Sequence, residues 1–282
     1  MFWIIKHNIS YKYSKPVVLE EHTVRLKPRS DTGQKLETYK LVIDPTPAFL
    51  THHNDIENNT LTTMWFEGPH SKLNIQATSR VNIISQNPFN FILTEPSTSH
   101  LPISYRDADS YILKQYTSQQ ESETRLLNEF LKPILDDSQG ETIPFLLGLA
   151  NHISCHFTNT QRKFGNPKKP ERTINDHKGA CRDFALLYVV ACRTVGLAAR
   201  FVSGYITPFN RDTKPALHAW AEVFLPGAGW LAFDPSYGMA ITERHISVAV
   251  SFKPANTLPV SGTFRGDNII SSMRTSVSLH QG

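Results

Sequence analysis

The sequence predicts an α+β protein, with a β-rich N-terminal part followed by a larger part in which helices pack on an antiparallel sheet. Two observations lead to this fold class. Before about residue 85, apolar residues recur at every second position in several short runs, as expected for strands with one buried face. After about residue 105 the spacing changes to three and four residues, which is the repeat of an amphipathic helix.

The N-terminal part, residues 1–85, is predicted to form a small β-sandwich-like domain. The side chains of His7, Ile9, Tyr11 and Tyr13 show the period of a strand. Similar runs occur at 23–26, 39–43, 61–66 and 73–84. Turn-rich segments separate these runs, and several short strands at this spacing are typical of sandwiches and barrels.

The rest of the chain is predicted to be a linker and a second domain. Residues 86–105 are interpreted as the linker, because they combine three prolines with many Ser, Thr and Asn residues. The second domain spans 106–282. Its helices follow from apolar positions at helical spacing (Leu126, Leu127, Phe130, Leu131 and Ile134) and from the segment 143–157. The polar segment 158–178 fits a solvated loop or a wall beside a site.

Composition limits the classes of function. The 282 residues are 40% hydrophobic and 19% charged, which allows a sizeable core. The net charge is only +4 and no long basic run occurs, so neither nucleic acid nor a membrane surface is an expected partner. The apolar start ends at Lys6, and no later stretch reaches about 18 apolar residues. Three cysteines do not form a disulfide framework. We therefore expect a soluble, cytoplasmic protein.

The segment 179–185 (G-A-C-R-D-F-A) indicates a reactive thiol, Cys181, at the start of a helix. Phe184, Leu187, Ala191 and Val195 form one helical stripe, and Gly196 follows it as a cap. The free N–H groups and the dipole of the first turn favour a thiolate, and the amide of Cys181 could donate to a developing oxyanion. The alternative is a cysteine that only packs in the core.

His218 and Asp234 lie on two predicted strands, 218–225 and 230–234, joined by a connection rich in Gly. If this connection has four residues, Leu225 pairs with Trp230 and the two side chains point to opposite faces. A connection with an odd number of residues brings them to one face, within reach of each other. We predict the odd length. The alternatives are a strand-end histidine and an aspartate that only starts a turn.

The same three residues could also be read as a metal site. Cys181, His218 and Asp234 are acceptable zinc ligands by type. Their spacings of 37 and 16 residues are unlike those of a compact metal site, so no metal or other cofactor is predicted.

The motifs G-A-C-R-D-F-A, H-A-W-A-E-V-F-L-P-G-A-G-W and F-D-P together resemble the transglutaminase-like core, a superfamily with a papain-like architecture. The segment 260–266 and the preceding His245-Ile246 resemble the tail of its bacterial branch, which includes candidate cysteine proteases. Residues 11–13, 25–29 and 69–70 resemble the N-terminal module that accompanies this branch. Ser236-Tyr237 departs from the Thr-Asn that often follows Asp-Pro in the family.

The resemblance implies that Cys181 is the nucleophile, His218 its base and Asp234 the residue that orients the base. It implies acyl transfer on amide bonds through a thioester, with a protein or peptide as substrate. Hydrolysis, as in a cysteine protease, is the leading expectation. The alternatives are amine transfer to protein glutamine and a non-catalytic binding module. The second oxyanion donor and the oligomeric state stay open.

Overall fold

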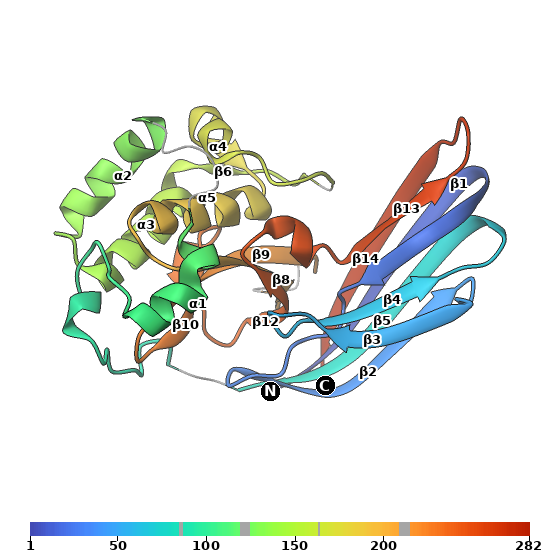
Figure 1. Cartoon of the computed structure of the whole chain (residues 1–282), viewed down its shortest axis with the longest axis horizontal. Helices are drawn as coiled ribbons and strands as arrows, with labels where there is room; N and C mark the ends of the chain where they lie inside the picture. The colour runs from blue at the N-terminus through green and yellow to red at the C-terminus, as the bar shows by residue number, and fades with distance from the viewer. Residues whose placement is uncertain (85–86, 119–124, 163, 209–214) are drawn as a thin grey trace.

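The computed structural model describes residues 1–84, 87–118, 125–162, 164–208 and 215–282. In Figure 1 a sheet of long strands lies beside a part that combines helices with a second sheet. This arrangement of helices and two sheets confirms the predicted α+β fold class, with a β region at the N-terminal side. The predicted boundary at residues 85–86 falls outside the described residues.

Five strands in the N-terminal region form most of the first sheet, in the order β2-β5-β1-β4-β3. They are β1 (Phe2–Val24), β2 (Gln34–Asp44), β3 (Phe49–Asn54), β4 (Thr60–Trp65) and β5 (Pro69–Ile83). The sequence predicted β1 as two separate runs and did not predict β3. Strand β3 lies at an edge and has no buried residue, so it lacks the alternation that marks the other strands.

The C-terminal residues also belong to this first sheet. Strand β14 (Ser271–Gln281) pairs with the first half of β1, and β13 (Val260–Arg265) pairs with its second half. The pairing of β1 with β5 shifts between Lys12 and Val17. Both halves contribute to one core cluster (Ile9, Tyr13, Val17, Leu19, Val24, Leu26, Met64, Phe66, Leu73, Ile75 and Ala77). The prediction that placed all of 106–282 in one domain did not include this return, because no local pattern encodes pairing across the whole chain.

The helices lie at the other end of the molecule (Figure 1). They are α1 (Asp107–Thr117), α2 (Arg125–Asp137), α3 (Thr142–His156), α4 (Pro170–Asp176) and α5 (Cys181–Thr194), preceded by the short helix η1 (Pro96–Thr98). Leu93, Leu101 and Ile103 of the predicted linker pack on the helical core. Among the described helices, none has the length and apolar character needed to cross a bilayer.

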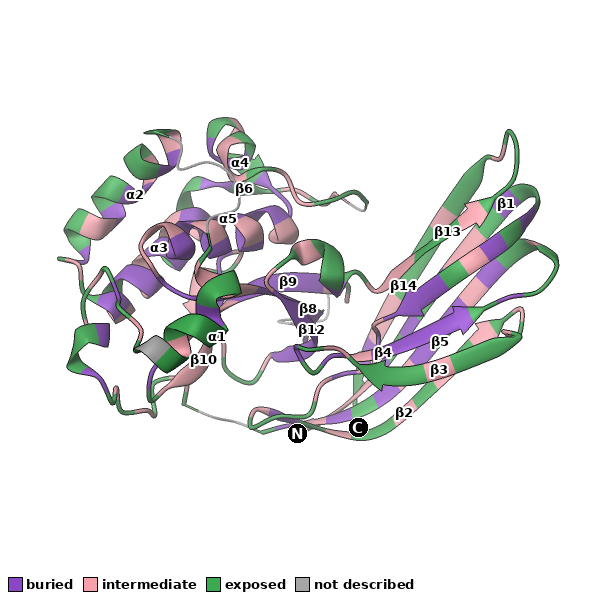
Figure 2. Cartoon of the chain, in the orientation of Figure 1, coloured by how far each residue is buried: buried purple, intermediate pink, exposed green. Residues whose placement is uncertain are grey.

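The second sheet has five strands in the order β11-β10-β9-β8-β12. They are β8 (Ala199–Ile206), β9 (Leu217–Leu225), β10 (Gly229–Asp234), β11 (Met239–Ala240) and β12 (His245–Ser251), and the helix η2 (Pro254–Thr257) follows. Figure 2 shows that buried residues concentrate in β8, β9 and β12. Helix α5 packs on β8 and β9 through Phe184, Tyr188 and their neighbours, which positions its first residue beside the sheet.

The two sheets contact each other through an apolar cluster. Ile5, Val81 and Leu279 of the first sheet meet Tyr205 and Ile246 of the second. The hydroxyl of Tyr205 also hydrogen-bonds to Nδ1 of His7, at 2.9 Å. This interface involves β8 and β12, so the N-terminal sheet supports one edge of the second sheet.

Candidate active site

Cys181 is the first residue of α5, as the sequence predicted. The preceding residue, Ala180, is extended, and its N–H donates to Oδ2 of Asp183 at 2.8 Å. The helix ends before Gly196, whose φ is +84°. The thiol is therefore at the positive end of a helix of 14 residues, where the first N–H groups have no partner within the helix.

Asp183 also anchors the segment that precedes the helix. The fully buried carboxylate accepts hydrogen bonds from the Arg162 guanidinium, at 2.5 Å, and from the Lys168 N–H, at 2.7 Å. Arg182 donates in turn to the carbonyl of Phe164. The segment 158–178 also contains α4 and the two-residue strands β6 (Thr158–Asn159) and β7 (Lys178–Gly179). Outside residue 163, which is not described, the segment contacts the helix that carries Cys181, while about half of its residues are exposed to solvent.

The hairpin of β9 and β10 has the register that the sequence required. Leu225 pairs with Gly229, so the connection is the three residues Pro226, Gly227 and Ala228. Gly227 has a φ of +87°, which a left-handed residue in such a loop needs. As a result His218 and Asp234 lie on the same face, and Nε2 of His218 is 2.7 Å from Oδ2 of Asp234. The prediction of an odd-length connection is confirmed.

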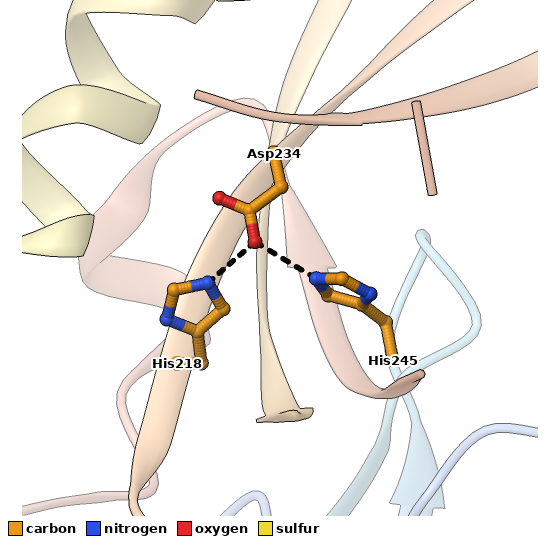
Figure 3. Close-up of side chains that lie close together, drawn as sticks. All are labelled: His218, Asp234 and His245. Atoms are coloured by element: carbon orange, nitrogen blue, oxygen red, sulfur yellow. Dashed lines mark hydrogen bonds and ion pairs between the residues drawn. The ribbon is translucent and has the colours of Figure 1, made fainter. Parts of the chain in front are cut away.

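The Asp234 carboxylate is fully buried and accepts three hydrogen bonds. Oδ2 accepts from Nε2 of His218 and, at 2.8 Å, from Nε2 of His245, while Oδ1 accepts from the Ser236 N–H at 2.8 Å. Figure 3 shows the carboxylate between the two rings. Burial alone would raise the pKa of Asp234, but the charge and hydrogen bond of His218, with the His245 bond, hold this pKa well below its ordinary value.

His218 joins the thiol to the carboxylate. Burial opposes its charged form, but the Asp234 carboxylate and the hydrogen bonds to Asp234 and Cys181 raise the pKa of His218 to about 10. Because Nε2 bonds to Asp234, Nδ1 is the ring nitrogen left for Cys181. Burial of the thiol acts against ionisation, but the bond to His218, its charge and the Ala219 amide lower the pKa of Cys181. The arrangement favours a thiolate beside an imidazolium.

His245 is a part of this cluster that the sequence did not predict as a site residue. It begins β12 and is 6% exposed. Burial lowers the pKa of His245 against the opposing effect of Asp234. The sequence marked it only as part of a tail motif, since nothing local links it to Asp234.

Two aromatic side chains complete the surroundings. The ring of Trp220 lies 6.2 Å from that of His218 and 5.0 Å from that of His245, between centroids. The ring of Tyr237 lies 5.7 Å from that of His218 and is 41% exposed. Trp220 is therefore a buried packing residue, whereas Tyr237 is an exposed ring beside His218.

The ligand atoms of His218, Asp234 and His245 all lie within 4.8 Å of one another, so their types and spacing would suit a metal ion. A metal-bound imidazole usually donates its second N–H to an acceptor. For His245, Nδ1 is buried and has no hydrogen-bond partner among the described residues. The donor set therefore fits a hydrogen-bonded cluster better than a metal centre.

Two family models match this chain. The bacterial transglutaminase-like N-terminal region matches residues 4–82. The transglutaminase-like superfamily matches residues 136–235, which contain Cys181, His218 and Asp234. This part of the chain is therefore a transglutaminase-like core. The two matched ranges thus correspond to most of the N-terminal sheet and to the part that carries Cys181, His218 and Asp234.

Relatives of this transglutaminase-like chain include an uncharacterised protein of Mycobacterium tuberculosis, 26% identical over 92% of this chain and 86% of that protein. The protein-glutamine gamma-glutamyltransferase of Pseudomonas aeruginosa is 29% identical over 34% of this chain and 15% of its own length. A solved structure of a candidate cysteine protease from Cytophaga hutchinsonii has a TM-score of 0.71 and 17% identity. It covers 100% of this chain and 91% of that one, so the whole fold is shared.

Proposed function

We propose that this protein is a cysteine-dependent acyl transferase that hydrolyses amide bonds in a protein or peptide substrate. The observation that carries the proposal is the chain of contacts from Cys181 through His218 to Asp234, with the pKa of the thiol lowered and that of the ring raised. A thiolate beside an imidazolium is the ground state that a cysteine nucleophile requires. The cytoplasmic location stays a prediction from the sequence.

In the first half-reaction the Cys181 sulfur attacks the amide carbonyl carbon, and a C–S bond forms. The oxygen of the tetrahedral intermediate gains a negative charge, which the Cys181 N–H at the end of α5 can stabilise. The C–N bond then breaks, and His218 gives its proton to the leaving nitrogen. The products are a free amine and a thioester on Cys181.

In the second half-reaction the neutral His218 ring takes a proton from water, and the water oxygen attacks the thioester. The C–S bond breaks and releases a carboxylic acid, which restores the thiolate and the imidazolium. Asp234 keeps Nε2 of His218 protonated, so that Nδ1 handles the moving proton in both steps.

The proposal is tested first at the thiol. With iodoacetamide near neutral pH, mass spectrometry should find Cys181 alkylated at least about tenfold faster than Cys155, and His218→Ala should slow that reaction. Cys155 is exposed and Cys192 is buried, so both serve as internal references. Alkylation of Cys181 no faster than that of Cys155 would overturn the proposal.

Turnover is then measured with a fluorescent casein digest, with Cys181→Ala as the inactive control. Peptide cleavage or ammonia release that depends on Cys181 supports hydrolysis. If the protein with Cys181 intact releases neither cleaved peptide nor ammonia beyond the Cys181→Ala control, the result argues against hydrolysis. A folded protein with neither thiol reactivity nor turnover would favour the non-catalytic binding module.

Amine transfer is the second candidate, favoured by the likeness to the glutamyltransferase of Pseudomonas aeruginosa. In that reaction a lysine amine replaces water as the group that attacks the thioester. Incorporation of a fluorescent amine into casein, compared with ammonia release from the same sample, separates the two reactions. Incorporation that exceeds hydrolysis would replace the leading proposal by this one.

A further inference from the structure

Two histidines bond to the Asp234 carboxylate, but the proposed reaction uses only one of them, His218. His245 donates to Oδ2, the oxygen that also bonds to His218. Figure 3 shows the two rings approaching this oxygen from opposite sides. With the Ser236 N–H on Oδ1, both oxygens of the carboxylate are held. A carboxylate fixed by three donors cannot turn away from His218 without losing a buried hydrogen bond.

The second nitrogen of His245 indicates which form of the ring is present. Nδ1 is buried and has no hydrogen-bond partner in the parts of the chain that the structure describes. A protonated ring would bury an N–H without an acceptor there, which is costly. The neutral ring with its proton on Nε2 avoids this cost and supplies the donor that Asp234 needs. His245 is thus a fixed donor, while His218 carries the moving proton.

The backbone near His245 is held by the N-terminal sheet. Strand β12 is an edge of the second sheet, and side-chain amides take the place of a neighbouring strand. Gln34 accepts from the Ser247 N–H at 2.7 Å and donates to the Ser247 carbonyl at 2.9 Å. Asn59 makes the same pair of bonds with Val250, at 2.8 and 2.7 Å. Ser247 is only two residues after His245.

We propose that His245 is a positioning residue that fixes the Asp234 carboxylate opposite His218, and that the N-terminal sheet holds His245 in place through the edge of β12. The inference rests on the proposed function, since it assumes that Asp234 orients His218. The charged and titratable groups that face His245 are Asp234 from β10, His218 from β9 and Arg244 from the turn before β12.

The test is the pH dependence of Cys181 alkylation by iodoacetamide in the whole chain. Loss of the His245 donor leaves a buried carboxylate one hydrogen bond short, so it turns away or takes a proton at a higher pH. For His245→Leu the acid limb of the profile should therefore move up by about one pH unit. His245→Gln, whose amide nitrogen can reach the position of Nε2, should stay within about 0.3 unit of the unchanged protein.

A matched control is His22→Gln, which replaces a buried histidine in the first sheet and should leave the profile unchanged. Thermal unfolding of each variant shows that it is folded. If His245→Leu does not fold, His245→Asn replaces it, because its shorter amide cannot reach Asp234. If the pH profile of Cys181 alkylation is not shifted in folded His245→Leu, or in the His245→Asn variant that replaces it, the proposal is overturned. An equal shift in His245→Gln would also overturn it, since the ring would then act only by packing against Trp220.

Alkylation does not require turnover, so this test is independent of which amide, if any, the protein cleaves. If Cys181 is reactive but no amide is hydrolysed, the positioning role is still measured. In a turnover assay the same variant should lose roughly tenfold in kcat with KM unchanged, because His245 does not touch the substrate. A rise in KM with kcat unchanged would contradict this role.

Discussion

His7 in the first sheet and His218 in the second are both buried, at 2% and 8% exposure, yet their pKa values lie on opposite sides of the ordinary value. His7 is bonded to two hydroxyls, those of Tyr205 and Thr275, and burial lowers its pKa to about 4. His218 is bonded to a carboxylate and a thiol, and its pKa rises to about 10. Because both rings are buried, the difference between these two pKa values comes from their partners rather than from burial itself.

Among the substitutions considered, Asp234→Asn should reduce the difference between the pKa values of His218 and His7 the most. The neutral amide removes the charge that raises the pKa of His218, so the ring should become neutral, as His7 is. The thiol pKa should then rise, and kcat for amide hydrolysis should fall by about 10³–10⁴. Asp44→Asn, an exposed carboxylate paired with Lys72, is the control and should keep full activity. If Asp234→Asn retains more than about a tenth of the activity, Asp234 does not orient the base.

The contrast also predicts how His7 affects stability in acid. His7 takes a proton at pH 6.5 when unfolded but at about pH 4 when folded. The unfolded state therefore binds more protons in this range, and stability falls as the pH drops from 6.5 to about 4, by about 3 kcal/mol at the end of the window. His7→Gln should reduce this slope in unfolding measurements across that window. An unchanged slope would show that His7 is not the group that loses stability.

Both sheets also place a ring over a glycine. A Cβ on Gly204 would lie 2.5 Å from the Trp220 ring and 2.2 Å from the Ile246 carbonyl, and a Cβ on Gly262 would lie 2.4 Å from the His22 ring. Each change to Ala should lower the free energy of unfolding by about 1–3 kcal/mol.

The two glycine variants should differ in activity. Gly204 pairs with both His218 and Ser247, so Gly204→Ala should also slow Cys181 alkylation. Gly262→Ala should leave the alkylation rate of the folded protein unchanged. Gly33→Ala, whose nearest neighbour would be 3.6 Å away, is the control for stability. Slower alkylation in Gly262→Ala would mean that the first sheet affects the site more broadly than through β12.

The smallest effect is expected from Gln34, which connects the first sheet to β12. Gln34→Ala removes the two side-chain bonds to Ser247 but leaves the Arg29 N–H on its carbonyl and Asn59 on Val250, so kcat should fall only about two- to fivefold, with KM unchanged. Gln76→Ala, at an exposed position of β5, is the matched control. If the two variants have equal kcat values, β12 holds His245 without help from Gln34.

The sequence predicts those parts of the fold and site that depend on local geometry. The start of α5 follows from Gly179 and Gly196 around an apolar stripe, and the hairpin register follows from counting residues between His218 and Asp234. The parts that it does not predict arise from contacts between distant segments.

His245 illustrates why the remaining contacts are hidden from sequence reasoning. It reaches Asp234 from β12, although β8 and β9 lie between β12 and β10 in the sheet. No periodicity encodes a contact across two intervening strands. The same reason applies to β13 and β14, which pair with a strand formed more than 230 residues earlier. Edge strand β3 has no buried face, so alternation could not reveal it.

The pairing of β1 with β13 and β14 has a consequence for how the protein matures on the ribosome. Strand β1 is synthesised long before β13 and β14, so the edge of β1 that they cover stays open until those two strands have left the ribosome. If β12 depends on that sheet, the thiol gains its full reactivity only after β13 and β14 have paired with β1.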